Sequence, residues 1–155
     1  MDYELKKLSL PPYTSMSVRQ NPSGRTMVLD VLRQRYVTLT PEEWVRQHFI
    51  NYLINHKGYP KALLANEVEL KVGDKRMRCD SVLFGPDKQP RMIMEYKAPD
   101  VLITENVFNQ IMSYNTILGV ETLVMSNGIQ HVIMHHDKAQ NKWLWLPELP
   151  AWECQ

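Results

Sequence analysis

Cysteine is scarce in this sequence, and long apolar runs and nucleotide-binding glycine motifs are missing from it. The two cysteines, Cys79 and Cys154, are too few for a disulfide framework or a thiolate metal cluster. No stretch has the length and apolar character of a signal peptide or a membrane span. Neither G-x-x-x-x-G-K-[ST] nor G-x-G-x-x-G occurs, so no nucleotide-driven motor or dinucleotide enzyme is indicated. We therefore expect a cytoplasmic protein without a membrane partner.

A strong net charge is also missing. The 155 residues include 18 Lys and Arg against 17 Asp and Glu, which gives a formal net charge of +1. A strongly basic domain would indicate a nucleic-acid partner, and this balance does not. Any surface that binds phosphate must therefore be a local patch, offset by acidic residues elsewhere.

The length and the 44% hydrophobic content suit one domain with a core of its own. Residues 1–25 are rich in Pro, Ser and Gly and predict an extended lead-in, so the domain would span residues 26–155. Two short strands or an arm are expected directly after the lead-in. The further predicted elements are, in order, a helix over 41–57, strands over 65–72, 75–84 and 92–98, a helix over 105–118, and strands over 121–126, 129–136 and 142–146. This order predicts an α/β sandwich around a mixed sheet.

The strand predicted over 92–98, MIMEYKA, carries two charges among apolar residues. Side chains alternate between the faces of a strand, so Glu95 and Lys97 point to the same side. Two opposite charges on one face of a mostly apolar strand indicate either a salt-bridged sheet edge or a functional site. The preceding strand has to decide between these two interpretations.

That preceding strand carries Asp80. If residues 85–90 close a symmetric hairpin, Phe84 lies opposite Arg91 and Asp80 lies directly opposite Glu95, with Cβ atoms ~5 Å apart. Facing carboxylates repel each other unless a cation lies between them, and Mg²⁺ suits oxygen ligands of this kind. The alternative is a solvated cluster of charges on an edge strand, and spacing alone favours that alternative.

Asp80, followed after fourteen residues by Glu95-Tyr96-Lys97, resembles the D…ExK signature of the PD-(D/E)xK nuclease superfamily. More narrowly, five segments resemble, in order, the N-terminal nuclease domain of type I restriction enzyme R subunits. They are LTPEEWVRQHFINYLINHKGYP, RCDSVLF, MEYKAP, NQIMSY and LVMSNG, and the resemblance covers residues 26–146. It implies a restriction-endonuclease-like αβββαβ fold, with a central mixed sheet flanked by helices. It also implies an endonuclease that hydrolyses DNA phosphodiester bonds with Mg²⁺, or alternatively Mn²⁺.

The resemblance implies roles for individual residues. Asp80 and Glu95 would be metal ligands, the backbone carbonyl of Tyr96 a third ligand, and Lys97 the catalytic lysine. Glu43 matches an acidic residue that many of these nucleases direct from the first helix toward the metal. A capping box with Thr40 would explain Glu43 equally well.

Four more residues are candidates on the helices. Gln110 and Tyr114 match the Q-x-x-x-Y element of the family, and their i, i+4 spacing predicts that both face the sheet. A core-edge pair that merely satisfies its own hydrogen bonds is the alternative. Arg46 and Gln47, one turn after Glu43, would contact phosphate, although a solvated helix face is the default for such residues.

The sequence departs from the family pattern in two respects. Cys79 stands where the family has a proline before the first acidic residue. The R subunits continue into ATP-driven motor domains, whereas no motor motif occurs here, so we expect a stand-alone domain that works with a separate motor or methylase subunit. A homodimer would supply two active sites. A catalytically inactive nucleic-acid-binding or partner-docking module of the same fold is the alternative.

Overall fold

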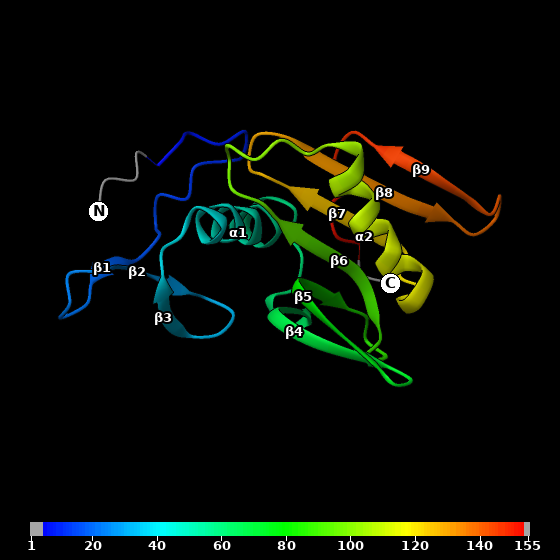
Figure 1. Cartoon of the computed structure of the whole chain (residues 1–155), viewed down its shortest axis with the longest axis horizontal. Helices are drawn as coiled ribbons and strands as arrows, with labels where there is room; N and C mark the ends of the chain where they lie inside the picture. Colours follow the sequence, from blue (N-terminus) through cyan, green and yellow to red (C-terminus); the bar gives the residue numbers. More distant parts are fainter. Residues whose placement is uncertain (1–4, 154–155) are drawn as a thin grey trace.

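The computed structural model describes residues 5–153, except for the side chains of residues 111 and 114–117. Its main element is a six-stranded sheet with the strand order β4-β5-β6-β7-β8-β9 (Figure 1). β6 and β7 are parallel, and all other neighbours in this sheet are antiparallel. The strands are β4 (Leu64–Val72), β5 (Lys75–Phe84), β6 (Pro90–Tyr96), β7 (Thr122–Ser126), β8 (His131–Asp137) and β9 (Lys142–Leu146).

A smaller antiparallel sheet precedes the first helix. Its three strands are β1 (Val18–Gln20), β2 (Thr26–Asp30) and β3 (Arg35–Thr38), in that spatial order. β1 lies inside the segment that the composition predicted to be an extended lead-in. Its pairing with β2, with Val18 opposite Val28, makes this part of the lead-in a strand of the folded protein.

The first helix, α1 (Pro41–Asn51), begins as the sequence predicts. Thr40 is its N-cap, and the Thr40 hydroxyl accepts a hydrogen bond from the Glu43 amide at 3.1 Å. The helix continues as a π-helical turn, η1 (Tyr52–His56), and a 3₁₀ turn, η2 (Lys61–Leu63), leads into β4. The second helix, α2 (Glu105–Leu118), connects the parallel strands β6 and β7.

The two helices cover different sets of sheet residues and so define two hydrophobic clusters. α1 contributes Val45, Phe49, Ile50 and Leu53 to the first cluster, where they meet Leu83, Met92, Met94, Tyr96, Val124 and Ile133. α2 packs on the second cluster, which contains Cys79, Val82, Ile93, Leu123, Met125 and Met134. The predicted α/β architecture and its helix–three strands–helix–strand order are therefore confirmed. No helix within the described part of the chain has both the length and the apolar character needed to cross a membrane.

One detail of the predicted register is wrong. A bulge between Leu83 and Phe84 places Phe84 opposite Pro90 and not opposite Arg91. The turn absorbs an additional residue because Lys88 adopts a left-handed conformation, with φ of 65°, and the Gly85 amide bonds the Gln89 carbonyl at 2.8 Å. The bulge lies at the turn, so it leaves the remainder of the β5–β6 hairpin in the predicted register.

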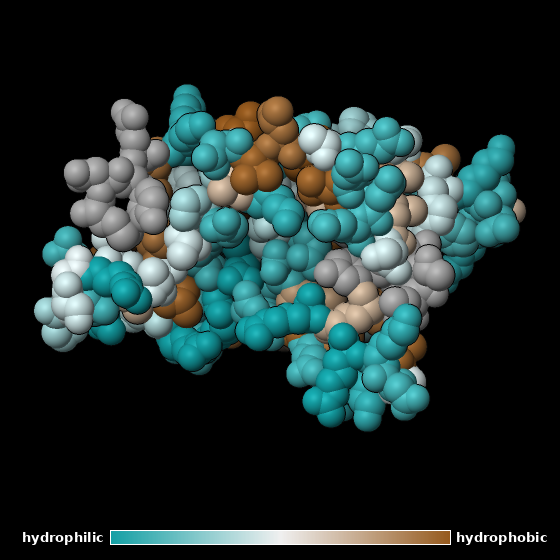
Figure 2. All heavy atoms as spheres, viewed as in Figure 1, coloured by the Kyte–Doolittle hydropathy of each residue, from teal (hydrophilic) through white to brown (hydrophobic). Residues whose placement is uncertain are grey.

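The β4–β5 hairpin extends beyond the body of the molecule (Figure 1). The two strands are paired from Leu64 opposite Leu83 to Val72 opposite Lys75, and residues 71–76 are all exposed. At the lower edge of Figure 2 the projecting surface is mostly hydrophilic.

Residues 5–10 contact the turn between β7 and β8. This contact requires glycine at position 128, because Leu8 packs directly against it. Leu8 is buried, and the Ser9 amide donates to the Gly128 carbonyl at 2.8 Å. A Cβ at Gly128 would lie 2.6 Å from Leu8 Cδ2, whereas a Cβ at Gly24 would meet nothing within 4 Å. Both glycines have nearly the same backbone conformation, with φ of +84° and +82°.

We therefore expect Gly24→Ala to cost about 1 kcal/mol of unfolding free energy, because alanine is strained at positive φ. Gly128→Ala should cost about 2–3 kcal/mol, because Leu8 must also move. Urea denaturation of the two variants measures the difference. Equal losses would contradict a stabilising contact between Leu8 and the turn.

Candidate active site

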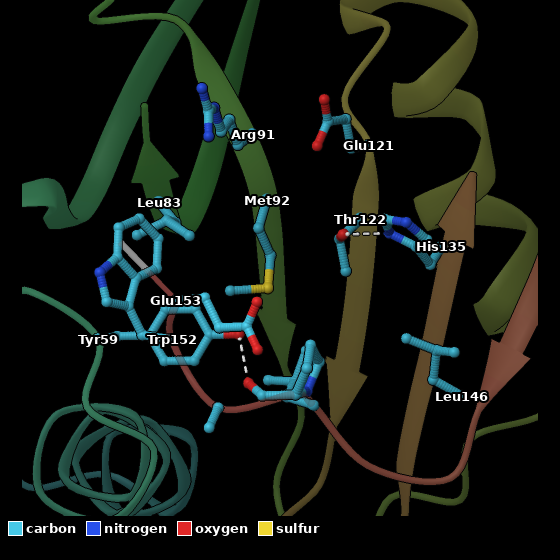
Figure 3. A pocket seen from close by; sticks show the side chains of 13 residues that line it. Tyr59, Leu83, Arg91, Met92, Glu121, Thr122, His135, Leu146, Trp152 and Glu153 are labelled. Atoms are coloured by element: carbon cyan, nitrogen blue, oxygen red, sulfur yellow. Dashed lines mark hydrogen bonds between the residues drawn. The ribbon is translucent and has the colours of Figure 1, made fainter. Parts of the chain in front are cut away.

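One cavity of the structure does not involve the predicted site residues. It has a volume of about 290 Å³ and lies between the first residues of β6 and β7 and the C-terminal segment (Figure 3). Arg91, Glu121, His135 and Trp152 are among its lining residues, and Asp80, Glu95 and Lys97 are not. Since Arg91 lies near the start of β6 and Glu95 lies near its end, the candidate site is at the opposite end of this strand.

The structure brings Asp80 and Glu95 together. Ser81 pairs with Met94 in the β5–β6 ladder, and Asp80 and Glu95 are the next residues along the two strands. The Asp80 carboxylate accepts a hydrogen bond from the Tyr96 amide at 2.9 Å. The Asp80 carboxylate therefore takes the place of the main-chain carbonyl that would otherwise accept this hydrogen bond in the β5–β6 ladder. The bond fixes the Asp80 side chain against β6.

Glu95 is an interior carboxyl group with an incomplete set of partners. Its Oε1 atom is buried and has no hydrogen-bond partner. Burial, and next the charge of Asp80, raise the pKa of Glu95 to about 9, although Lys97 acts in the opposite direction. Without a further positive charge, this raised pKa keeps Glu95 protonated at neutral pH. An arrangement of this kind stores unfavourable electrostatic energy that a cation would release.

Lys97 lies directly after β6 and is half-buried. Its amide donates to the Ser126 carbonyl of β7 at 2.9 Å, which extends the contact between these parallel strands. Among the residues that the structure describes, its ammonium group forms no ion pair within 4 Å. The positive charge of Lys97 nevertheless lowers the pKa of Glu95, so the two side chains interact electrostatically.

The oxygen atoms at this site fit a hard divalent cation that also binds ligands other than protein side chains. Two carboxylates face each other, and one buried oxygen has no partner. No cluster of three His, Cys, Asp or Glu side chains suited to a metal occurs within the described residues. A cation here would therefore complete its shell with water, main-chain carbonyls or substrate, which is common for Mg²⁺ and uncommon for structural Zn²⁺. The Tyr96 carbonyl remains the predicted third protein ligand.

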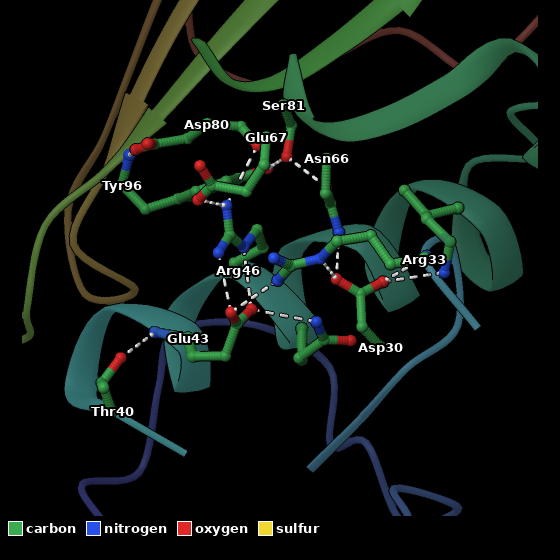
Figure 4. A network of polar contacts seen from close by, with 12 residues as sticks. Asp30, Arg33, Thr40, Glu43, Arg46, Asn66, Glu67, Asp80, Ser81 and Tyr96 are labelled. Carbon is green, nitrogen blue, oxygen red and sulfur yellow. Dashed lines mark hydrogen bonds and ion pairs between the residues drawn. The ribbon is translucent and has the colours of Figure 1, made fainter. Parts of the chain in front are cut away.

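Arg46 connects the first helix to the backbone of Asp80 (Figure 4). Its guanidinium donates to both oxygens of Glu43 at 2.7 Å, to Glu67 Oε1 at 2.7 Å and to the Asp80 carbonyl at 3.0 Å. Burial alone would lower the pKa of Arg46, but the bonds and charges of Glu43 and then Glu67 raise it. Arg46 is therefore a fixed interior cation that holds the main chain at Asp80.

The structure corrects the predictions for the first helix. Glu43 is only 5% exposed, and its carboxylate pairs with Arg33, Arg46 and Gln47, so it does not complete a capping box and is held by these partners. Arg46 and Gln47 are 8% and 1% exposed, so the solvated helix face is wrong. Neither side chain offers a surface for phosphate contact in this structure. The helical period placed all three on one side of α1, and the structure turns that side inward.

Glu67 is a residue of the site that the sequence did not indicate. It has a left-handed backbone, with φ of 54°, and it interrupts the β4–β5 ladder at the position opposite Asp80. Burial raises the pKa of Glu67, but bonds from Arg46 and Arg78 hold it below its ordinary value. Positive φ at a residue other than glycine costs about 1 kcal/mol or more, and such residues cluster at functional sites.

A chain of buried polar contacts leads from the site to the N-terminal sheet (Figure 4). The Tyr96 hydroxyl donates to Ser81 Oγ, which donates to Asn66 Oδ1 at 2.6 Å. Asn66 Nδ2 in turn donates to Asp30 Oδ2 at 3.0 Å, at the end of β2. Arg33 closes the path, because it pairs with both Asp30 and Glu43. These contacts form a ring that returns through Arg46 to the carbonyl of Asp80.

Comparison with known families decides where this fold and site belong. Residues 41–150 match the family described as Type I restriction enzyme R protein N terminus (HSDR_N). The chain belongs to this family. The matched range contains α1, all six strands of the main sheet, Asp80, Glu95 and Lys97.

A solved structure shares the fold of this HSDR_N chain. It is a fragment assigned to an HsdR subunit of a type I restriction enzyme from Vibrio vulnificus YJ016, with a TM-score of 0.51 and 19% sequence identity. The similarity covers 73% of this chain and 24% of that chain, so this chain spans about a quarter of the other protein's length. A search of the curated proteins found no match.

The family resemblance also predicted that Gln110 and Tyr114 face the sheet. Gln110 is exposed on α2, so this expectation is wrong for Gln110. The i, i+4 pattern gave the wrong orientation because the apolar contacts of α2 come from Val107, Phe108, Met112 and Leu118, which turn Gln110 away from the sheet. The side chain of Tyr114 lies outside the described residues.

Proposed function

We propose that this HSDR_N domain is a metal-dependent endonuclease that hydrolyses phosphodiester bonds in DNA, with Mg²⁺ as the ion and Mn²⁺ as a substitute. The observation that carries the proposal is the pair of neighbouring carboxyl groups near the end of β6, where the charge of Asp80 acts on Glu95 and the Glu95 Oε1 atom is buried. Membership of the restriction R-protein family supports the same assignment.

Each residue has a task in the proposed reaction. Asp80 and Glu95 hold the ion, which supplies positive charge to the phosphate and lowers the pKa of water when it is bound. Lys97, whose ammonium group makes no other ion pair within the described residues, orients the attacking oxygen and stabilises the charge that develops on phosphate. Arg46 holds the Asp80 main chain, so the position of the first ligand does not depend on the substrate.

Partners and location are part of the same proposal. A separate motor or methylase subunit would act with this chain, as the family resemblance implies. A homodimer would provide two sites for cutting both strands. Cys79, a free and buried thiol, agrees with a reducing cytoplasm.

The test combines metal titration with plasmid nicking. Isothermal titration with Mg²⁺ and Mn²⁺ should show binding to the wild type and a loss of at least ~10-fold in affinity for Asp80→Asn. Nicking of supercoiled plasmid should require the ion, stop in EDTA and fall by ~100-fold or more in Asp80→Asn. Asp87→Asn is the matched control, since it makes the same change in an exposed carboxylate at the other end of the β5–β6 hairpin.

Two outcomes would reject the proposal. If neither ion binds, the carboxyl pair is not a metal site in this chain. If DNA binds in EDTA with a steep salt dependence and no product forms, the domain is an inactive nucleic-acid-binding module of the same fold.

A further inference from the structure

Basic side chains concentrate on the projecting β4–β5 hairpin. Residues 71–78 contain four basic residues and one acidic residue, while the whole chain has a net charge of only +1. The four basic residues, Lys71, Lys75, Arg76 and Arg78, are all exposed. Because the whole chain is nearly neutral, any surface that binds phosphate must be a local basic patch. The β4–β5 hairpin is such a patch.

Few of these charges are neutralised. Arg76 contacts Glu69 at 3.7 Å, but both side chains are more than half exposed, and pairs of that kind are weak. Lys71 and Lys75 take part in no ion pair within the described range. Three charges are therefore free, or easily freed, to meet an anionic partner.

Arg78 links this surface to the candidate active site. Its Nε donates to Glu67 Oε2 at 2.8 Å, while 76% of its side chain is exposed. The other oxygen of Glu67 accepts from Arg46, which holds the Asp80 carbonyl. The guanidinium of Arg78 is thus oriented on one side and open to solvent on the other, two residues before Asp80.

The strained backbone at Glu67 accounts for this arrangement. The residue interrupts the ladder opposite Asp80 with φ of 54°, and its carboxylate bridges an interior and a surface arginine. Two short bonds to arginine compensate for a conformation that glycine or asparagine would adopt more easily. The strain places one carboxylate where it orients both the metal-ligand strand and Arg78.

We infer that the β4–β5 hairpin binds the phosphate backbone of the DNA substrate, and that Arg78 contacts the phosphate next to the cleaved bond. The inference rests on the proposed function for the identity of the substrate. Lys71, Lys75 and Arg76 contact phosphates farther along the strand, and they make no base-specific contact. Arg78 is a substrate-positioning residue. Its hydrogen bond to Glu67 fixes the position of its guanidinium relative to Asp80.

The test measures the salt dependence of DNA binding. Fluorescence anisotropy with a 30-bp duplex of arbitrary sequence, in EDTA so that no cleavage occurs, gives the slope of log K against log salt. The hairpin variant Lys71→Gln/Lys75→Gln/Arg76→Gln should lower this slope by ~2–3, because each phosphate contact contributes ~0.9. Affinity at ~100 mM salt should fall by ~10-fold or more. The control variant Lys88→Gln/Lys138→Gln/Lys142→Gln removes three exposed lysines from the β5–β6 and β8–β9 hairpins and should retain the slope.

Arg78 needs a separate readout. In the nicking assay Arg78→Gln should raise KM and lower kcat, since a misplaced phosphate reacts more slowly. Arg78→Lys keeps the charge but loses the planar guanidinium that Glu67 orients, and it should recover KM more than kcat. Full recovery of both constants by lysine would overturn the positioning role.

The outcomes separate this inference from the proposed function. Equal slopes for the hairpin and control variants would overturn the inference, even if the wild type nicks plasmid. A lower slope for the hairpin variant alone supports it, even if no nicking is found and the nuclease proposal fails. A wild type without measurable affinity for the duplex would overturn the inference, while the nicking assay with Mg²⁺ decides the proposed function separately.

Discussion

Replacing Glu95 with glutamine should abolish metal-dependent nicking and, at the same time, stabilise the metal-free protein at neutral pH. The loss of activity follows from the loss of one of the two proposed carboxylate ligands and should be ~100-fold or more. The gain in stability follows because the substitution removes a buried acid whose ionisation is opposed by burial and by Asp80. We expect a gain on the order of 2 kcal/mol near pH 7.

The pH dependence gives this prediction a second measurement. The folded protein raises the pKa of Glu95 from 4.5 to about 9. The stability that the protonated carboxyl contributes is present below pH 4.5 and is lost as the pH rises toward 9. Urea denaturation in EDTA should therefore show the wild type losing stability over this range, and Glu95→Gln losing less of it. Mg²⁺ should restore stability to the wild type and not to the variant.

Glu148→Gln serves as the matched control for this experiment. Glu148 is 71% exposed, and its pair with Lys57 spans 3.5 Å, so its loss should change stability by less than ~0.5 kcal/mol. If Glu95→Gln destabilised the metal-free protein as a core defect would, the carboxyl pair would not store electrostatic energy.

Arg46→Met should be the most destabilising single substitution in the polar network. It leaves Glu43 buried beside a reduced set of positive charges and removes one partner of Glu67. Breaking a buried pair by removing one member costs about 3–5 kcal/mol. For a chain of this length that corresponds to a fall of roughly 6–20 °C in melting temperature, measured by circular dichroism.

Arg78→Met isolates the effect of burial. It removes the other arginine that binds Glu67, but 76% of the Arg78 side chain is exposed, so its loss should cost less than ~1 kcal/mol. Adding Glu43→Gln to Arg46→Met should recover part of the lost stability, because the buried carboxylate that Arg46 no longer neutralises is then replaced by a neutral amide. Similar costs for Arg46→Met and Arg78→Met would show that the network contributes little to stability.

The sequence was sufficient for the part of the site that depends on local pairing. Alternation along a strand and the near symmetry of one hairpin were enough to place Asp80 beside Glu95, because pairing register fixes which residues face each other. The bulge at Phe84 escaped prediction, since it depends on Lys88 adopting a conformation that lysine rarely adopts. It caused no error at the carboxylates, which lie at the other end of the ladder.

The parts of the site that depend on long-range contacts were beyond the sequence. The same T-P-E-E pattern would precede a capping box or an interior ion pair, and here Arg33 and Arg46 together hold the Glu43 carboxylate in an interior ion pair. Asn66 meets Asp30 across 36 residues of sequence, and no periodicity indicates such a contact. Glu67 lies in an ordinary alternating strand pattern, and the sequence gives no sign of its left-handed backbone conformation.

The ring of polar contacts also bears on where this domain begins. The family match starts at residue 41, yet two of the groups that complete the ring, Asp30 and Arg33, lie before it. A piece cut at the start of the matched region would keep Glu43 and Asn66 while discarding one hydrogen-bond partner of each, Arg33 and Asp30. The family match and the polar network therefore have different borders, because the network includes Asp30 at the end of β2 and Arg33 in the turn that follows it.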